Sequence, residues 1–274
     1  MPRRVSRFVI TNQGMQEQIG KEIGIHGPEW DSLHQGYFSD IKIAGAFIEK
    51  VKESITATCP EVIVDLGGGT GFLLSELFRQ GLSNHIRLVN VDCSDAQLSI
   101  AHTRDIHCIR SSIADFRRTD IDQEKKRFLF IMRSVLHYFG RNGLIPLLRH
   151  IRSQAKEGEL FVHQTASFET HREAECINVL YEKMRTSKWY PTIQELSKCM
   201  ISAGWTISSI FPAPALALAS HDLARRYAIS NDDIKDICDK ITKRFGEIEK
   251  VFRVEKDGFC AYLHYRIYIC AAIS

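Results

Sequence analysis

The segment 61–77 constrains the fold of this chain more than any other part of its sequence. It reads EVIVDLGGGTGFLLSEL. The β-branched residues at its start are typical of a buried parallel strand, and the apolar residues at its end have helical spacing. Between them lie Asp65 and the glycines Gly67, Gly69 and Gly71. Glycine permits positive φ angles and a close approach of the backbone to a ligand. The segment therefore predicts a strand, a ligand-binding loop and a helix.

The spacing of the glycines distinguishes between nucleotide-like ligands. A dinucleotide-binding loop has the pattern G-x-G-x-x-G, but Phe72 stands in the place of the third glycine. A P-loop needs Lys and then Ser or Thr after its last glycine, whereas Phe72 and Leu73 follow here. An acid followed by G-x-G-x-G resembles motif I of the class I S-adenosylmethionine-dependent methyltransferases. The resemblance implies that S-adenosylmethionine is the cofactor and that Asp65 and the three glycines bind it.

A second run, 86–92, reads as a strand that ends in an acid. Asp92 lies 21 residues beyond Gly71. An acid at about this distance is placed to accept hydrogen bonds from ribose hydroxyls. The alternative is that Asp92 only belongs to the N-cap region of the next helix, where Ser94 or Asp95 could serve. We predict that Asp92 and the adjacent Cys93 contact the cofactor.

A third run leads from His107 to Phe116. In the family that the chain resembles, an acid at this place binds the adenine amino group and a neighbouring apolar side chain packs against the ring. The resemblance thus implies cofactor contacts for Asp115 and Phe116. A solvated loop acid is the alternative for Asp115.

The fourth run, 127–139, is strongly apolar and predicts a central strand. Ligands of open α/β sheets bind at the carboxyl ends of strands where the strand order reverses, so 65–71 and 133–138 should form opposite sides of one cleft. The residues Val-Leu-His-Tyr at 135–138 look like the end of strand four in small-molecule methyltransferases. We assign Arg133 to the cofactor, Tyr138 to the acceptor, and His137 to general-base catalysis. His163, at the end of the next predicted strand, is a second candidate base, and a histidine satisfied within the core is the alternative for both.

Strands and helices continue to alternate beyond this point. The pattern predicts an α/β fold with a doubly wound, mostly parallel seven-stranded sheet and helices on both faces. Residues 260–272 are expected to form one long final strand. We expect a helical N-terminal cap at 1–54, a Rossmann-like catalytic domain at 55–274, and helical insertions near 171–188 and 221–250. The cap should cover the cleft and line the acceptor pocket with four residues: Trp30, His34, Tyr37 and Phe38.

Composition limits the classes of partner. With 36 basic and 33 acidic residues the net charge is +3, which is too balanced for non-specific nucleic-acid binding. No apolar stretch approaches the ~20 residues that cross a bilayer, and the amino end lacks the apolar segment of a secretion signal. The eight cysteines show neither a C-x-x-C pair nor zinc spacing. We expect a cytoplasmic protein with no metal, nucleic-acid or membrane partner, and leave open whether it is a homodimer.

The acceptor class follows from what the end of the fourth run lacks. Amino-methyltransferases of nucleic acid or glutamine carry Asn/Asp-Pro-Pro-Tyr/Phe there, but this chain has RSVL at 133–136. The paired glutamates that a protein-arginine site needs are also missing. The leading hypothesis is methyl transfer to a small molecule, with an O, N or C target. The alternatives are a cofactor-binding protein of the same fold without methyl transfer, and a nicotinamide-dependent oxidoreductase.

Overall fold

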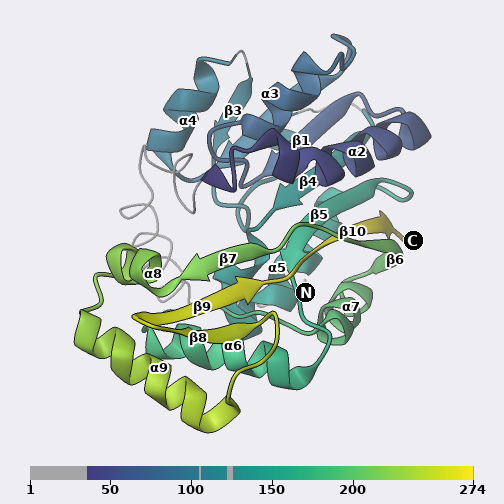
Figure 1. Ribbon diagram of the computed structural model, residues 1–274. Coiled ribbons are helices and arrows are strands. Elements are labelled where there is room, and N and C mark those ends of the chain that lie inside the picture. The colour runs from purple at the N-terminus through teal and green to yellow at the C-terminus, as the bar shows by residue number, and fades with distance from the viewer. Residues whose placement is uncertain (1–35, 105, 122–125, 274) are drawn as a thin grey trace, which may run out of the picture.

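A seven-stranded sheet forms the centre of the molecule (Figure 1). The computed structural model describes residues 36–104, 106–121 and 126–273. The strand order is β3-β2-β1-β4-β5-β10-β6, in which β1 to β5 pair in parallel and β10 runs antiparallel to both neighbours. The strands of this sheet are β1 Val62–Leu66, β2 Arg87–Asp92, β3 His107–Arg110, β4 Phe128–Arg133, β5 Leu160–Ala166, β6 Trp205–Pro212 and β10 Tyr265–Ala272. The predicted doubly wound, mostly parallel sheet is confirmed.

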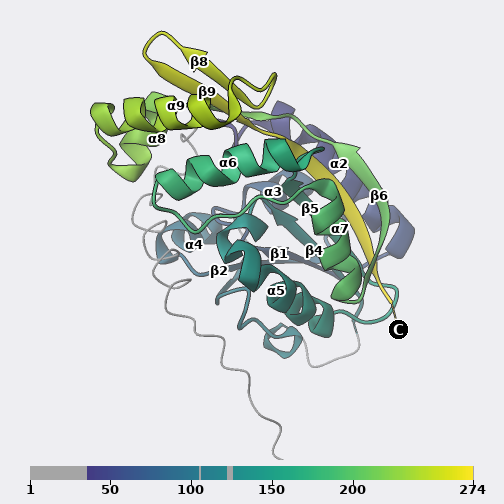
Figure 2. The ribbon, with the colours of Figure 1, turned by 90° about the horizontal axis from the view of Figure 1, so that it is seen from below.

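Helices cover both faces of this sheet because its central strands are apolar on both sides. Every residue of β1 and β4 is buried, as expected of parallel strands between two helical layers. Phe47 of α2 (Ile41–Thr58) and Leu74 of α3 (Phe72–Arg79) pack with Ile131 on one face. Leu148 of α5 (Gly140–Gln154) and Leu196 of α7 (Ile193–Ser202) pack on the other. Figure 2 shows α2 and α5 on opposite sides of the sheet. Helix α4 (Asp95–His102) packs beside β2 and β3.

Helix α2 belongs to the layer that covers the sheet. Asp40 caps it by accepting a hydrogen bond from the Lys42 backbone, and its buried stripe includes Phe47, Ile48 and Val51. Because α2 continues to Thr58, the expected boundary between residues 54 and 55 falls inside this helix. The rest of the predicted cap, residues 1–35, lies outside the described residues.

A second, smaller sheet is inserted between β6 and β10. Its antiparallel order is β7-β9-β8, and its strands are β7 Leu216–Ala219, β8 Phe252–Glu255 and β9 Gly258–Leu263. It shares an apolar core with the helices of the two predicted insertions, which are α6 His171–Lys183, α8 Ser220–Tyr227 and α9 Asn231–Phe245. Figure 1 shows α8 and α9 around this sheet.

The single long strand expected at 260–272 is wrong. The chain leaves β9 at Leu263 and enters β10 at Tyr265, so its two halves pair in different sheets. The backbone of His264, between them, accepts a hydrogen bond from the Ser167 amide. The apolar pattern continues through the break because both halves are buried, and periodicity alone therefore did not reveal it.

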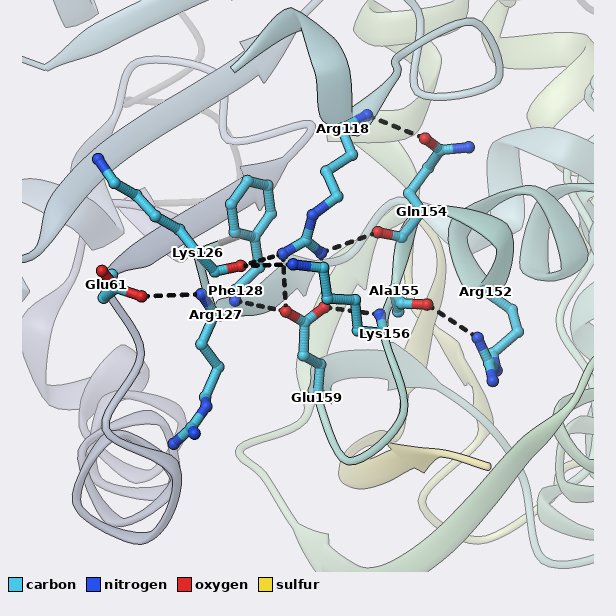
Figure 3. Close-up of polar contacts among 10 residues, drawn as sticks. All are labelled: Glu61, Arg118, Lys126, Arg127, Phe128, Arg152, Gln154, Ala155, Lys156 and Glu159. Atoms are coloured by element: carbon cyan, nitrogen blue, oxygen red, sulfur yellow. Dashed lines mark hydrogen bonds and ion pairs between the residues drawn. The ribbon is translucent and has the colours of Figure 1, made fainter. Parts of the chain in front are cut away.

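A buried ion pair lies at the amino ends of β4 and β5 (Figure 3). Glu159 is 2% exposed, and its two carboxylate oxygens accept bonds of 2.7 and 2.9 Å from the Arg118 guanidinium. They also accept the backbone N–H groups of Phe128 and Lys156, at 2.7 and 2.8 Å. Arg118 lies over the Phe128 ring and also donates to the Lys126 carbonyl. This network joins β4 and β5 at the end of the sheet opposite the glycine loop.

Candidate active site

The glycine loop leaves β1 in a conformation that only glycine adopts easily. Gly67, Gly69 and Gly71 have φ values of 75°, 56° and 73°. A Cβ atom on Gly67 would lie 2.8 Å from the Val135 side chain, which follows β4. The loop and the segment after β4 are therefore close neighbours, and that they form two sides of one cleft stays a prediction.

Two side chains of β2 hold the peptide groups of Gly69. Asp92 Oδ2 accepts the Gly69 N–H at 3.0 Å, and the Asn90 amide donates to the Gly69 carbonyl at 2.8 Å. Asp92 Oδ1 accepts the Ser94 N–H at 2.8 Å, while the Ser94 hydroxyl is the N-cap of α4. Asp92 thus orders the loop and the turn before α4. Sequence reasoning missed Asn90, although an amide within an otherwise apolar strand was a signal.

Three polar side chains lie on one face of the sheet at the carboxyl ends of β1, β4 and β5. Arg133 pairs in register with Gln164. Asp65 pairs in register with Ile131, and Ile131 lies two residues before Arg133 in β4. Because alternate residues of a strand share a face, all three lie on the face covered by α2 and α3. Asp65 and Gln164 are fully buried and Arg133 is 8% exposed.

Asp65 and Arg133 carry polar atoms that lack hydrogen-bond partners within the described chain. The atoms are both carboxylate oxygens of Asp65 and Nε of Arg133, whereas the Gln164 amide lies beside the Tyr37 hydroxyl. Burial and, to a smaller extent, the charge of Asp92 raise the pKa of Asp65 to about 8, against the opposing effect of Arg133. Unsatisfied buried groups are uncommon in folded proteins. Clustered at strand ends, they fit a ligand that bears both a positive and a negative group. Gln164 was not among the predicted site residues.

Arg133 also holds the chain segment that precedes α2. Its guanidinium donates to the carbonyls of Tyr37 and Phe38, at 3.2 and 3.0 Å. The Tyr37 hydroxyl donates to the Pro214 carbonyl at 2.5 Å, and its ring stacks on Tyr265. Tyr37 is therefore buried between β10 and the chain that leads from β6 to β7, while Phe38 lines a pocket described below. The other two predicted acceptor residues of the cap, Trp30 and His34, lie outside the described residues.

The two candidate histidines occupy different surroundings. His137 follows β4 and is 6% exposed; its ring lies 4.1 Å from that of Tyr138 and stacks on Tyr190. His163 is fully buried in β5, between the rings of Phe161 and Tyr268. It points to the sheet face opposite Asp65, and burial lowers its pKa to about 3. His163 therefore has no access to the cleft, and the structure gives no support to it as a base.

The remaining predicted cofactor residues follow β2 and β3. Cys93 is half-buried next to Asp92, and burial raises the pKa of its thiol to about 11. Asp115 is exposed in the turn after β3. Phe116 packs in the core, 1% exposed, and its carbonyl bonds to His150. Its ring is thus mainly a packing element of the sheet.

Comparison with known proteins identifies the family. The sequence profile of a methyltransferase domain matches residues 44–210, which is more than half of the chain and includes the glycine loop, Asp92 and His137. The chain belongs to this methyltransferase family. It is a class I enzyme, and S-adenosylmethionine is its cofactor. No curated protein matches the sequence.

Solved structures share the fold of the methyltransferase at low sequence identity. The YcgJ protein of Bacillus subtilis is 11% identical, with a TM-score of 0.60 over 84% of this chain and 98% of that one. Geranyl diphosphate C-methyltransferase from Streptomyces coelicolor is 14% identical, with a TM-score of 0.52 over 85% and 80%. A protein of Thermotoga maritima described as a possible histamine N-methyltransferase is 13% identical, with a TM-score of 0.50 over 91% and 99%.

The cleft of the methyltransferase fits the chemistry of its cofactor. S-adenosylmethionine carries an ammonium, a carboxylate and ribose hydroxyls, and when bound it supplies an electrophilic methyl group on a sulfonium. The buried polar groups of Asp65, Arg133 and Gln164 match the charged methionine end. Asp92, which already accepts two backbone N–H groups, has further lone pairs for hydroxyl donors.

Asp65→Asn is expected to make the stability of the cofactor-free enzyme less dependent on pH. The folded-state pKa of Asp65, about 8, lies above its ordinary value of 3.8. Between these values the folded state keeps a proton that the unfolded state has lost, so the wild-type free energy of unfolding falls as pH rises, by up to about 1.4 kcal/mol per pH unit. Urea unfolding across this range should show a shallower decline for the variant. If the free energy of unfolding fell equally with pH in wild type and Asp65→Asn, Asp65 would not hold a proton in the folded state. The matched control is Asp95→Asn, at an exposed position.

Metal-ligating side chains are not clustered in the part of the chain that the structure describes. Within it, no group of three or more His, Cys, Asp or Glu residues is arranged to hold a metal ion. Within the same described ranges, no helix is both long and apolar enough to cross a bilayer.

Proposed function

We propose that the methyltransferase transfers its methyl group to a small-molecule acceptor held at the carboxyl end of β4. One observation carries this proposal: a pocket lies between Ser134 and His137, which follow β4, and the leucines of the small sheet, Leu216, Leu218 and Leu263. Val135, between Ser134 and His137, is the residue that packs against Gly67. Two residues of the pocket wall therefore flank the side chain that contacts the glycine loop, which we propose binds the cofactor.

The walls of this pocket suit a compact, partly apolar molecule. Five of its described lining residues are Phe or Tyr and three are Leu. Its volume is about 10 Å³, which is the size of one water, so its described walls must separate to admit an acceptor. A nucleic acid or a folded protein would need an open surface here instead.

In this proposal the polar residues of the cleft contact different parts of the cofactor. Asp92 accepts the ribose hydroxyls while it orders the glycine loop, and Asp65 pairs with the ammonium. Arg133 and Gln164 face the methionine carboxylate. Burial of this end excludes water, which strengthens each of these contacts. Cys93 and Asp115 are assigned to the adenine side of the cleft.

His137 is the residue we assign to the acceptor. Its ring is fixed by stacking on Tyr190, at 5.1 Å, and lines the pocket next to the end of β4. Methyl transfer is an in-line displacement, so most of its acceleration comes from holding the acceptor atom about 3 to 3.5 Å from the methyl group. A histidine in this place can orient the acceptor, and can accept its proton where one must leave.

The small molecules bound by, or named for, two of the similar structures support the proposal of a small-molecule acceptor. The Streptomyces coelicolor enzyme was solved with geranyl diphosphate and S-adenosylhomocysteine, and the Thermotoga maritima protein is named for histamine. The eight cysteines, none of which forms a disulfide, support a location in the reducing cytoplasm.

Methyl-labelled S-adenosylmethionine tests the proposed function directly. The enzyme is incubated with the labelled cofactor and a cell extract, and the extract is then separated by dialysis into small molecules and macromolecules. We expect the label in the dialysable fraction as a product distinct from the cofactor and its breakdown products. Label confined to protein or nucleic acid would refute the small-molecule acceptor, and boiled enzyme measures the background.

His137→Ala should slow the formation of the labelled product by about 10² to 10⁴-fold, because positioned proton transfer typically accelerates a reaction by this factor. Affinity for S-adenosylhomocysteine, measured by calorimetry, should change little since His137 lies on the acceptor side. The exposed His221→Ala is the matched control. A loss under threefold would show that His137 neither positions nor deprotonates the acceptor.

A further inference from the structure

A pair of buried hydroxyl groups lines the acceptor pocket. Ser134 Oγ and Tyr265 Oη lie 2.5 Å apart, and the two residues are 4% and 1% exposed. Both residues belong to the wall of the pocket, together with His137. The pair is therefore placed where we propose that the acceptor binds.

The hydrogen bond within this pair leaves one donor unused. Each hydroxyl carries one hydrogen, and only one of the two hydrogens lies in the bond that the oxygens share. Neither hydroxyl has a further hydrogen-bond partner in the part of the chain that the structure describes. Because an unpaired buried donor costs free energy, the second hydrogen is available to a ligand that enters the pocket.

The backbone of Ser134 has an uncommon conformation. Its φ angle is 62°, in the left-handed region that serine rarely adopts. Its N–H donates to the Gln164 carbonyl at 2.8 Å, so β5 fixes this turn. A glycine would adopt the same φ more easily but would lack the hydroxyl. Strained residues of this kind cluster at ligand sites, and this conformation therefore supports a role for the Ser134 side chain in binding.

Tyr265 is also fixed by its surroundings. It is the first residue of β10, where it pairs with Ala166 of β5, and its ring stacks on that of Tyr37. Burial raises the pKa of its hydroxyl to about 12, so the hydroxyl keeps its proton at neutral pH. The pair is thus an uncharged donor whose position is set before an acceptor enters, which lowers the entropy cost of binding.

We propose that the hydroxyl pair of Ser134 and Tyr265 donates a hydrogen bond to an oxygen of the acceptor, and that it selects small molecules with a hydroxyl or carbonyl oxygen at this place. The proposal rests on the function proposed above, because it concerns the acceptor of the same pocket. Val135, which follows Ser134, is the neighbour of Gly67, so this bond would hold the acceptor near the glycine loop. An analogue without the oxygen would leave the buried donor unpaired and would bind less tightly.

Two probes of nearly the same shape test the proposal. Acetophenone has a carbonyl oxygen where α-methylstyrene has a methylene group, so only acetophenone can accept the hydrogen bond. Both are titrated by calorimetry into enzyme saturated with S-adenosylhomocysteine, and the ratio of their two affinities is compared between wild type and variants. The comparison cancels the difference in hydrophobicity between the two probes, because this difference is the same for every variant.

Removal of both hydroxyls should weaken the binding of acetophenone alone. In the double variant Ser134→Ala/Tyr265→Phe, the affinity for acetophenone relative to α-methylstyrene should fall by about three- to tenfold, as expected for one neutral hydrogen bond. Both substitutions are needed, because either hydroxyl by itself can still donate its hydrogen. Ser134→Gly, which suits the positive φ, replaces Ser134→Ala in a second form of the double variant.

Another hydroxyl pair on β10 provides a matched control. Ser167 Oγ and Tyr268 Oη are buried and lie 2.7 Å apart, but neither residue is among the described residues of the pocket wall. The double variant Ser167→Ala/Tyr268→Phe should keep the affinity ratio of the wild type. An unchanged ratio without the Ser134 and Tyr265 hydroxyls, an equal fall in the control, or no binding of acetophenone to the wild type would overturn the proposal.

Cofactor binding separates a failure of this inference from a failure of the proposed function. Loss of S-adenosylhomocysteine binding by the wild type, or label found only in macromolecules, would count against the proposed function. Normal cofactor binding and labelled small products, together with an unchanged affinity ratio in the double variant, would count against the hydroxyl pair alone.

Discussion

Asp92→Ala is expected to lower the affinity for S-adenosylmethionine by at least about tenfold, and by as much as about 150-fold. Asp92 is the acceptor for the backbone N–H groups of Gly69 and Ser94, at 3.0 and 2.8 Å. Its removal therefore costs the proposed ribose contact and also releases the glycine loop from β2. Each charge-assisted hydrogen bond is worth about 1.5 to 3 kcal/mol, which sets this range. Calorimetry with S-adenosylhomocysteine measures the effect.

The neighbouring Asp95→Ala is the matched control for this substitution. Asp95 makes an exposed ion pair with Arg110, a type of contact that contributes about 0 to 1 kcal/mol. The control should bind the cofactor as the wild type does. If folded Asp92→Ala protein keeps full affinity, Asp92 is only a structural residue of the turn before α4.

Glu159→Ala is expected to lower the free energy of unfolding by about 3 to 5 kcal/mol, which is typical when one partner of a buried ion pair is removed. The substitution leaves the Arg118 guanidinium without its two carboxylate bonds and leaves the N–H groups of Phe128 and Lys156 unsatisfied. All four bonds lie at the amino end of the sheet (Figure 3). Cofactor affinity should be nearly unchanged where the variant is folded, because the binding loop lies at the opposite end.

Urea unfolding of wild type, Glu159→Ala and Glu157→Ala distinguishes this network from an ordinary surface pair. Glu157 is exposed two residues away and should contribute little. A loss under about 1 kcal/mol for Glu159→Ala would mean that the ion pair behaves like a solvated one. A large loss of cofactor affinity in folded protein would mean that the two ends of the sheet are coupled.

The fold and the type of cofactor could be predicted from sequence because their signals are local. Apolar strands between two helical layers are continuous runs, and the positive φ angles of the loop require glycine at closely spaced positions. The acid at the end of β2 lies at a fixed distance along the chain from that loop. Each of these features depends on neighbouring residues alone, so Asp65, Gly67 and Asp92 could be singled out without knowing how the strands pair.

The parity of the strands decided which polar residues reach the cleft. His163 and Gln164 are adjacent in the sequence, but alternate residues of a strand face opposite sides of the sheet. Pairing of Gln164 with Arg133 places Gln164 on the sheet face of Asp65 and Arg133, and His163 then points into the core beneath α5 and α7. The sequence showed a polar end of a strand but did not show which of the two residues shared a face with Asp65.

Contacts between distant segments were decided by the tertiary structure alone. Lys188 and Tyr227 are 39 residues apart, and their hydrogen bond forms only because α8 packs beside the small sheet, close to the chain that follows α6. The same packing separates β9 from β10 within one continuous apolar run. Local periodicity records which residues are buried, because burial depends on the side chain itself. Local periodicity does not show which other residues cover them, because this depends on which of many apolar surfaces pack together when the chain folds.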